Sequence, residues 1–167
     1  MSTEPPRNGY RFWAFISYNW SDKRQARSLH QRLERFTVPR LVRRALRVRG
    51  LRDRHLRPVF RDDEEMTASG VLDERLREAV DGSAAMVLLA SPASALSPYV
   101  DLEVARFTAT RGVQRLAIVA IGEGGQRHPP LPASLRNLEG EPLWIDCRDD
   151  RGVSRRSLVR IAGSVSS

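Results

Sequence analysis

An aromatic residue and an acidic residue lie four positions apart near the start of a predicted helix. The helix begins at Ser97 and Pro98, because a serine hydroxyl can accept a hydrogen bond from a first-turn N–H, and proline at the first helical position removes no donor that the helix needs. Tyr99 and Glu103 then share one face of the helix near its N-terminus. A carboxylate and a ring held side by side in this way can hydrogen-bond to a ligand and stack on it.

The segment before this helix places the pair at an edge of a sheet. Residues 84–90 form a continuous apolar run, which is typical of a parallel strand covered by helices on both faces. The helix after it has apolar residues at the spacing i, i+4, i+7, namely Val100, Val104 and Phe107. Open parallel sheets bind ligands at the C-terminal ends of their strands. We therefore expect Tyr99 and Glu103 to face a ligand site.

The rest of the chain alternates between apolar runs and amphipathic segments. We predict strands over residues 12–16, 58–60, 84–90, 116–121 and 143–146. Helices are predicted over residues 21–36 with Ser21 as N-cap, 72–82, from 97 onward, 133–138 and 154–165, with a short helical turn around 41–46. This alternation predicts an α/β fold, an open parallel five-stranded sheet with helices on both faces.

Length and composition are those of a single domain. The chain has 167 residues, of which 41% are hydrophobic, and no apolar stretch is long enough to span a membrane. Residues 1–9 are polar, so we expect a flexible tail before a domain over residues 10–167, and no signal peptide. The one cysteine, Cys147, excludes an internal disulfide and fits a reducing cytoplasm.

The net charge of +8 makes nucleic acid a partner to consider. Much of the excess lies in the arginine-rich segment 40–57, and these arginines are not spread along one helix face. We interpret them as solvated or paired with acidic loops, so nucleic acid is the less favoured partner.

Several other site classes lack their signatures. The sequence contains no P-loop, no G-x-G-x-x-G after the first strand and no G-x-S-x-G, and its histidines lie too far apart for a metal site. A phosphoacceptor receiver domain needs an aspartate where Ala90 and Ser91 stand and a late lysine, whereas the only lysine is Lys23. We therefore predict no metal and no resident cofactor.

The remaining motifs resemble the Toll/interleukin-1 receptor (TIR) family, especially its bacterial members. The resemblance extends over residues 10–165 and rests on F-I-S-Y at 15–18 followed by Ser21-Asp22, a loop over 59–70 like the family's BB loop, Ser91-Pro92, and Tyr99 to Glu103 in place of W-x-x-x-E. The chain departs from that last motif by having tyrosine where the family has tryptophan, which keeps an aromatic face but reduces the stacking area.

The resemblance implies a flavodoxin-like sheet of strand order 2-1-3-4-5, with a crevice at the C-terminal ends of the first and third strands. Many TIR domains cleave NAD+ between nicotinamide and ribose, and some cyclise the product. The resemblance then makes Glu103 the catalytic residue and gives seven other residues substrate-binding roles: Ser17, Tyr18, Asn19, Trp20, Arg61, Asp62 and Tyr99.

A single carboxylate suffices for this reaction, because nicotinamide leaves as a neutral pyridine and needs no proton donor. Glu103 would stabilise the positive charge that develops on the ribose, and Tyr99 would stack on a ring of the substrate. Tyr18, Asn19 and Asp62 would position ribose or nicotinamide, and Arg61 would bind the pyrophosphate.

The family implies activation by self-assembly into a homo-oligomer or filament, an unseen sensor domain or partner, and a cytoplasmic role in antiphage defense. Two other functions stay open. One is a non-catalytic adaptor that acts through TIR–TIR assembly, and the other is nucleic-acid binding through residues 40–57.

Overall fold

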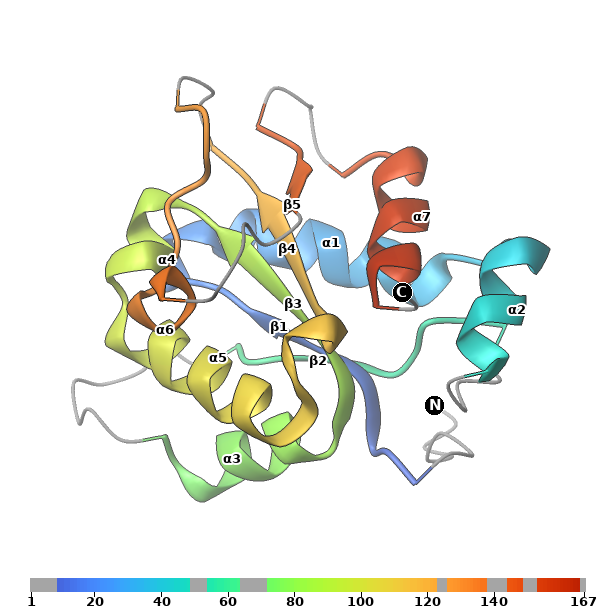
Figure 1. The fold of residues 1–167 in the computed structure, drawn as a ribbon, viewed down its shortest axis with the longest axis horizontal. Helices are drawn as coiled ribbons and strands as arrows, with labels where there is room; N and C mark the ends of the chain where they lie inside the picture. Colours follow the sequence, from blue (N-terminus) through green and yellow to red (C-terminus); the bar gives the residue numbers. More distant parts are fainter. Residues whose placement is uncertain are drawn as a thin grey trace.

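Five parallel strands form one sheet in the order β2-β1-β3-β4-β5 (Figure 1). The computed structural model describes residues 9–48, 54–63, 72–122, 126–137, 144–148 and 153–165. The strands are β1 (Phe12–Ser17), β2 (Val59–Arg61), β3 (Ser83–Ala90), β4 (Leu116–Ala120) and β5 (Trp144–Asp146). The predicted flavodoxin-like architecture and strand order are confirmed.

Helices connect the strands. They are η1 (Trp20–Asp22), α1 (Lys23–Arg35), α2 (Arg40–Val48), α3 (Glu74–Asp81), α4 (Pro92–Leu96), α5 (Pro98–Arg111), η2 (Val113–Arg115), α6 (Ala133–Arg136) and α7 (Arg155–Ser164), of which η1 and η2 are 3-10 turns. Within the described part of the chain, no helix combines the length and the apolar character that crossing a bilayer requires.

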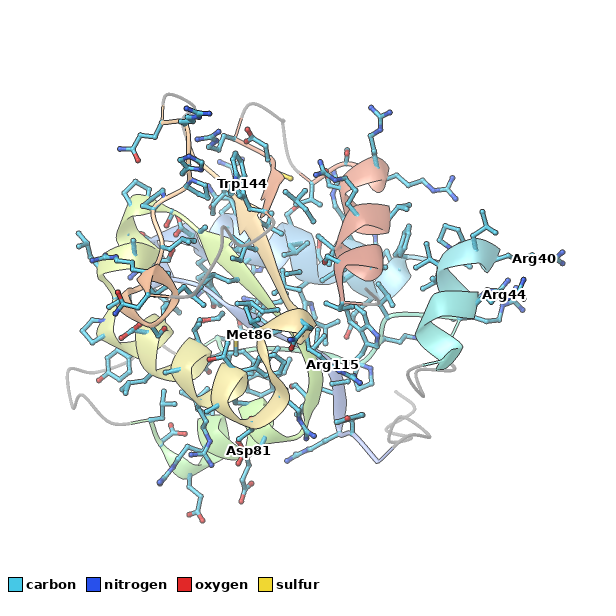
Figure 2. The ribbon with its side chains drawn as sticks, viewed as in Figure 1. Arg40, Arg44, Asp81, Met86, Arg115 and Trp144 are labelled. Atoms are coloured by element: carbon cyan, nitrogen blue, oxygen red, sulfur yellow. The ribbon has the colours of Figure 1, made fainter. Side chains whose placement is uncertain are left out.

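The central strand β3 is buried over its whole length, as its continuous apolar run predicts. From Ala85 to Ala90 its side chains alternate between two apolar clusters, because successive residues of a strand point to opposite faces. Val87 and Leu89 join the cluster that contains α1 and α7, whereas Met86 and Leu88 join the cluster that contains α3, α5 and α6. Figure 2 shows Met86 in the interior of the molecule. The two helix layers of Figure 1 thus cover the two faces of one sheet.

The start of α1 differs from the prediction. Ser21 was expected to cap this helix, but it lies inside η1, where Asn19 Oδ1 accepts its backbone N–H at 3.0 Å and its hydroxyl at 2.7 Å. The N-cap of α1 is Asp22, whose side chain makes no capping hydrogen bond. The Ser21 prediction is wrong because the asparagine two residues earlier makes a competing local turn.

The start of α5 follows the prediction, and a second helix uses the same signal. Ser97 Oγ accepts a hydrogen bond from the Val100 N–H, with Pro98 as the first helical residue. Six residues earlier, Ser91 and Pro92 start α4, where Ser91 and Ser94 form a reciprocal capping box. The sequence prediction missed α4, although its Ser-Pro pair is the signal that located α5.

The arginine-rich connector contains more helix than expected. A short turn was predicted around residues 41–46, and α2 covers Arg40–Val48. Figure 2 shows Arg40 and Arg44 extending from the same side of α2, as their i, i+4 spacing requires. The predicted tail before Gly9 and residues 64–70 of the acidic loop lie outside the described residues.

Candidate active site

Glu103 belongs to α5 and is only 7% exposed. Its carboxyl lies at the C-terminal end of β1. Ser17, the last residue of β1, donates its hydroxyl to Glu103 Oε2 at 2.5 Å. The helix explains the burial, because Glu103 belongs to the buried stripe that includes Val100, Val104 and Phe107. The acid therefore lies on the core-facing side of α5 itself, at the edge of the sheet.

This environment changes the acidity of Glu103. Burial raises the pKa of the carboxyl from 4.5 to about 8, the Ser17 hydroxyl opposes this rise, and the nearby negative charge of Asp62 adds to it. Removing a carboxylate from water favours the neutral form, and a hydrogen bond donated to the carboxylate favours the charged form. In this environment Glu103 is mainly a neutral acid at neutral pH.

Residues at the end of β2 lie against the end of β1. Asp62, which is buried, accepts a hydrogen bond from Arg75 Nη2 at 2.8 Å through its Oδ1 atom. Its backbone carbonyl accepts the hydroxyl of Tyr18, the residue that follows β1. Burial raises the pKa of Tyr18, so this hydroxyl stays a donor at neutral pH.

Arg61 brings a buried positive charge to the same edge of the sheet. Its side chain is only 9% exposed and forms an ion pair with Asp63. The Nε atom of Arg61 is buried and has no hydrogen-bond partner in the described residues. The guanidinium also lies close enough to Tyr18 to lower the pKa of that hydroxyl, although burial outweighs this effect. A guanidinium with spare donors suits a bound anion.

A second hydrogen bond crosses the point where the strand order reverses. Ser91, which follows β3, donates its hydroxyl to Asp22 Oδ2 at 2.5 Å, so the loop after β1 is joined to the start of α4. Burial raises the pKa of Asp22, and the Ser91 hydrogen bond lowers it. The sequence identified these two residues only as motif positions. Because the two residues lie 69 positions apart, no local sequence pattern predicts their hydrogen bond.

The positions of three other predicted site residues, Asn19, Trp20 and Tyr99, do not test their predicted roles. Asn19 caps η1, and the Lys23 Nζ atom lies 3.9 Å from the centroid of the Trp20 ring, so one face of that ring is occupied. Tyr99 is partly buried and packs against the cluster of α3 and α5. The substrate roles of Asn19, Trp20 and Tyr99 stay predictions.

Hydrogen bonds therefore join Ser17 to Glu103 and Tyr18 to Asp62, and the negative charge of Asp62 acts on Glu103 from nearby. A neutral buried acid at a sheet edge can donate a hydrogen bond to a hydroxyl, and it can become an anion when a cation is bound beside it. In the described ranges no group of three His, Cys, Asp or Glu side chains is arranged to hold a metal ion.

Comparisons with known proteins agree with this architecture. A sequence model of the family described as TIR domain matches residues 44–159. A relative from Actinoplanes sp., named NAD(+) hydrolase ApTIR, is 34% identical over 151 residues, which cover 83% of this chain and 19% of that protein. The chain thus spans about a fifth of the length of that relative.

A solved structure, a metazoan TIR-STING receptor from C. gigas in complex with 2',3'-cGAMP, covers 98% of this chain with a TM-score of 0.56 and 22% sequence identity. The match covers 43% of that receptor chain. At this level of identity the likeness establishes a shared fold.

Proposed function

Because this chain belongs to the TIR domain family and is of the bacterial type, we propose that it cleaves NAD+ at the bond between nicotinamide and ribose. The observation that carries the proposal is the buried Glu103 carboxyl, hydrogen-bonded to Ser17 at the C-terminal end of β1. The name of the Actinoplanes relative, an NAD(+) hydrolase, supports it.

In the proposed reaction the bond from ribose C1′ to the nicotinamide nitrogen breaks, and its electron pair leaves with nicotinamide as a neutral pyridine. The ribose becomes oxocarbenium-like, and the Glu103 carboxylate stabilises that charge by Coulombic attraction and by a hydrogen bond to a ribose hydroxyl. Water then adds to C1′ and releases a proton, which gives ADP-ribose. In a cyclising reaction a nucleophilic atom of the same ADP-ribose replaces the water.

The reaction needs Glu103 as an anion, whereas the protein surroundings of the carboxyl favour the acid form. The substrate resolves this conflict, because the nicotinamide ring of NAD+ carries a positive charge that favours the carboxylate when it lies beside Glu103. Binding of the substrate would therefore release the proton of Glu103 and produce the carboxylate that the reaction needs. The Ser17 hydroxyl acts in the same direction and holds the carboxylate in place.

The other residues would bind and orient the substrate. Arg61 has a buried guanidinium with a spare donor, which suits the pyrophosphate. Asp62, Tyr18 and Asn19 would position ribose or nicotinamide, while Tyr99 and Trp20 offer aromatic faces for the rings.

Activity is proposed to need self-assembly, as the family resemblance implies, with a sensor domain or partner supplying the trigger. A cytoplasmic role in antiphage defense belongs to the same proposal. The second candidate is a non-catalytic adaptor that works through TIR–TIR assembly.

The decisive experiment incubates NAD+ with the wild type, with Glu103→Ala and with Glu78→Ala over a range of protein concentrations. Mass spectrometry of the products follows nicotinamide, ADP-ribose and cyclic ADP-ribose. Glu78 is an exposed glutamate on α3, so its variant controls for the loss of one carboxylate. We expect Glu103→Ala to lose at least about 100-fold in rate, and Glu78→Ala to match the wild type.

Equal rates for wild type and Glu103→Ala would remove Glu103 from the mechanism. A folded wild type that self-associates, yet releases no nicotinamide at any concentration, would favour the adaptor. A specific activity that rises with protein concentration would support the requirement for assembly.

A further inference from the structure

A cavity of about 360 Å³ is lined by residues from the C-terminal end of α1 and the N-terminal end of α7. These two helices cover the same face of the sheet (Figure 1). The cavity is lined by Arg32, Arg35, Phe36, Thr37, Arg155 and Leu158. The cavity is not part of the crevice described above. Helix α1 begins near the crevice at Lys23 and ends at Arg35, about 18 Å further along its axis.

Three arginines from two helices line this cavity, and among the described residues no acidic side chain lines it. Arg32 Nη1 donates to the Val153 carbonyl at 2.6 Å, which fixes one guanidinium at the wall. Arg35 and Arg155 are exposed and make no hydrogen bond or ion pair with any residue that the structure describes. A group of positive charges favours the binding of an anion.

The backbone of α7 adds donors to the same wall. Ser154 is the N-cap, and it accepts the Ser157 N–H at 3.2 Å through its hydroxyl and the Leu158 N–H at 3.0 Å through its carbonyl. The N–H groups of Arg155 and Arg156 are left without an acceptor inside the helix, since the first turn of a helix has none to offer. The helix dipole favours negative charge at this end as well.

The rest of the wall is apolar. Phe36 and Leu158 are 6% and 5% exposed and belong to the cluster under α1 and α7, so the cavity reaches down to the core. Its volume lies at the lower end of the range for small-molecule pockets, about 300–1,000 Å³. A ligand that matches both parts of the wall has a phosphate at one end and an organic group at the other.

We propose that this cavity binds a small phosphate monoester of about mononucleotide size, with its phosphate on Arg35 and Arg155 and its organic part on Phe36 and Leu158. A phosphate monoester carries a charge of about −1.5 to −2 at neutral pH and three acceptor oxygens, which match two guanidinium groups. The proposal is independent of the NAD+ chemistry, because no residue of the crevice takes part.

The test is isothermal titration calorimetry of the full chain with AMP, ribose 5-phosphate, inorganic phosphate and adenosine. The double variant Arg35→Ala/Arg155→Ala removes the proposed phosphate ligands. Its matched control is Arg27→Ala/Arg160→Ala, which removes two exposed arginines from the same two helices at positions outside the cavity.

We expect one AMP or ribose 5-phosphate per chain, bound at least tenfold more tightly than inorganic phosphate, with no measurable binding of adenosine. Affinity should fall at least tenfold in Arg35→Ala/Arg155→Ala and change less than twofold in the control. Tighter binding of AMP than of ribose 5-phosphate would assign the ligand as a nucleotide, and the reverse order would assign it as a sugar phosphate.

Three results would overturn the proposal. Equal losses in the two double variants would mean that general charge attracts the ligand. AMP binding that survives in Arg35→Ala/Arg155→Ala would place the ligand elsewhere, including in the crevice. Tight binding of a single-stranded oligonucleotide without saturable binding of AMP or ribose 5-phosphate would assign the arginines to nucleic acid.

Discussion

At the scale of single residues, a carboxylic acid occupies a position that helix packing normally gives to an apolar side chain. Glu103 lies three residues after Val100 and four before Phe107, so it belongs to the buried stripe of α5. Burying a carboxyl costs free energy that a leucine there would not cost, and the Ser17 hydroxyl offsets only part of it. Packing alone does not explain an acid at this position, and the proposed catalytic role would account for it.

The buried acid predicts how NAD+ cleavage depends on pH. The proposed reaction needs ionised Glu103, whose pKa is about 8, so kcat/KM should rise as the pH increases through that value. In Ser17→Ala the carboxylate loses its hydrogen-bond donor, so the pKa should rise further and the rate near pH 7 should fall about tenfold or more. Steady-state kinetics between about pH 6 and 10 measures both effects.

Ser17→Thr is the control, because it keeps a hydroxyl at the end of β1, and it should recover most of the rate and of the wild-type profile. A merely structural role for Ser17 would lower the rate equally at every pH. A wild-type profile that stays flat through pH 8 would contradict the proposed ionisation.

The same acid predicts that stability falls as the pH rises. Glu103 keeps its proton in the folded protein up to about pH 8, whereas the unfolded chain loses it near pH 4.5. The folded state therefore binds more protons between these values, and the free energy of unfolding decreases across this window by up to about 5 kcal/mol. Glu103→Gln removes the effect, so its stability advantage should be small near pH 4 and largest near pH 8.

Urea unfolding of wild type, Glu103→Gln and the exposed control Glu78→Gln near pH 4, 6 and 8 tests this prediction. The control should follow the wild type at each pH. An advantage of Glu103→Gln that does not change with pH would show that the gain comes from packing and not from the proton.

At the scale of elements, the sequence predicts most strands and helices because their periodicity and caps are local. The apolar run of β3 and the Ser97 cap of α5 are of this kind, and both are found in the structure. Contacts between distant segments have no such signal. The hydrogen bond from Ser91 to Asp22 joins residues 69 positions apart, so the sequence shows each residue but not the pair.

This hydrogen bond leads to a prediction about the crevice. In Asp22→Ala the turn η1 loses its hydrogen bond to the start of α4, so the proposed substrate-binding side chains on either side should be held less firmly. We expect KM for NAD+ to rise about 5- to 20-fold and stability to fall by about 1.5–3 kcal/mol, the usual value of a hydrogen bond to a charged group. Steady-state kinetics and urea unfolding measure the two effects.

Asp101→Ala is the matched control, because Asp101 Oδ1 accepts the Ser134 N–H at 2.7 Å and so joins α5 to α6 in a similar way. It should lose a similar amount of stability with little change in KM. Asp22→Asn retains an acceptor and should stay close to the wild type. If both alanine variants raise KM equally, the effect reflects stability and not the crevice.

At the scale of the whole molecule, two apolar clusters on opposite faces of one sheet hold the fold together. Apolar runs in the sequence predict that strands exist, but they do not give their order, which came from the resemblance to the TIR family. This order places the ends of β1 and β3 side by side. Ser17 can then form a hydrogen bond with Glu103, which lies 86 positions later in the sequence. The role of each site residue depends on a substrate and is not encoded in local patterns.

The two clusters predict which end of the chain the domain needs. Helix α7 contributes Leu158, Ile161 and Ala162 to the cluster on its face of the sheet, and Val165 follows it. Burying each leucine or isoleucine side chain is worth about 1.5–3 kcal/mol, so removing residues 154–167 removes a large share of a typical net stability of about 5–15 kcal/mol. Residues 1–8 contain a single apolar residue, Met1, so their removal should change Tm by less than about 2 °C.

Thermal unfolding followed by circular dichroism compares the two truncated chains, and we expect no cooperative transition once residues 154–167 are gone. Two neighbouring substitutions keep the prediction testable if that chain does not accumulate. Ile161→Ala should cost about 2–5 kcal/mol, because Ile161 is fully buried, and Arg160→Ala should cost less than about 0.5 kcal/mol, because Arg160 is exposed. A chain without residues 154–167 that unfolds cooperatively near the wild-type Tm would show that the α7 layer is dispensable, and the cluster beneath it would then have to be closed by other residues.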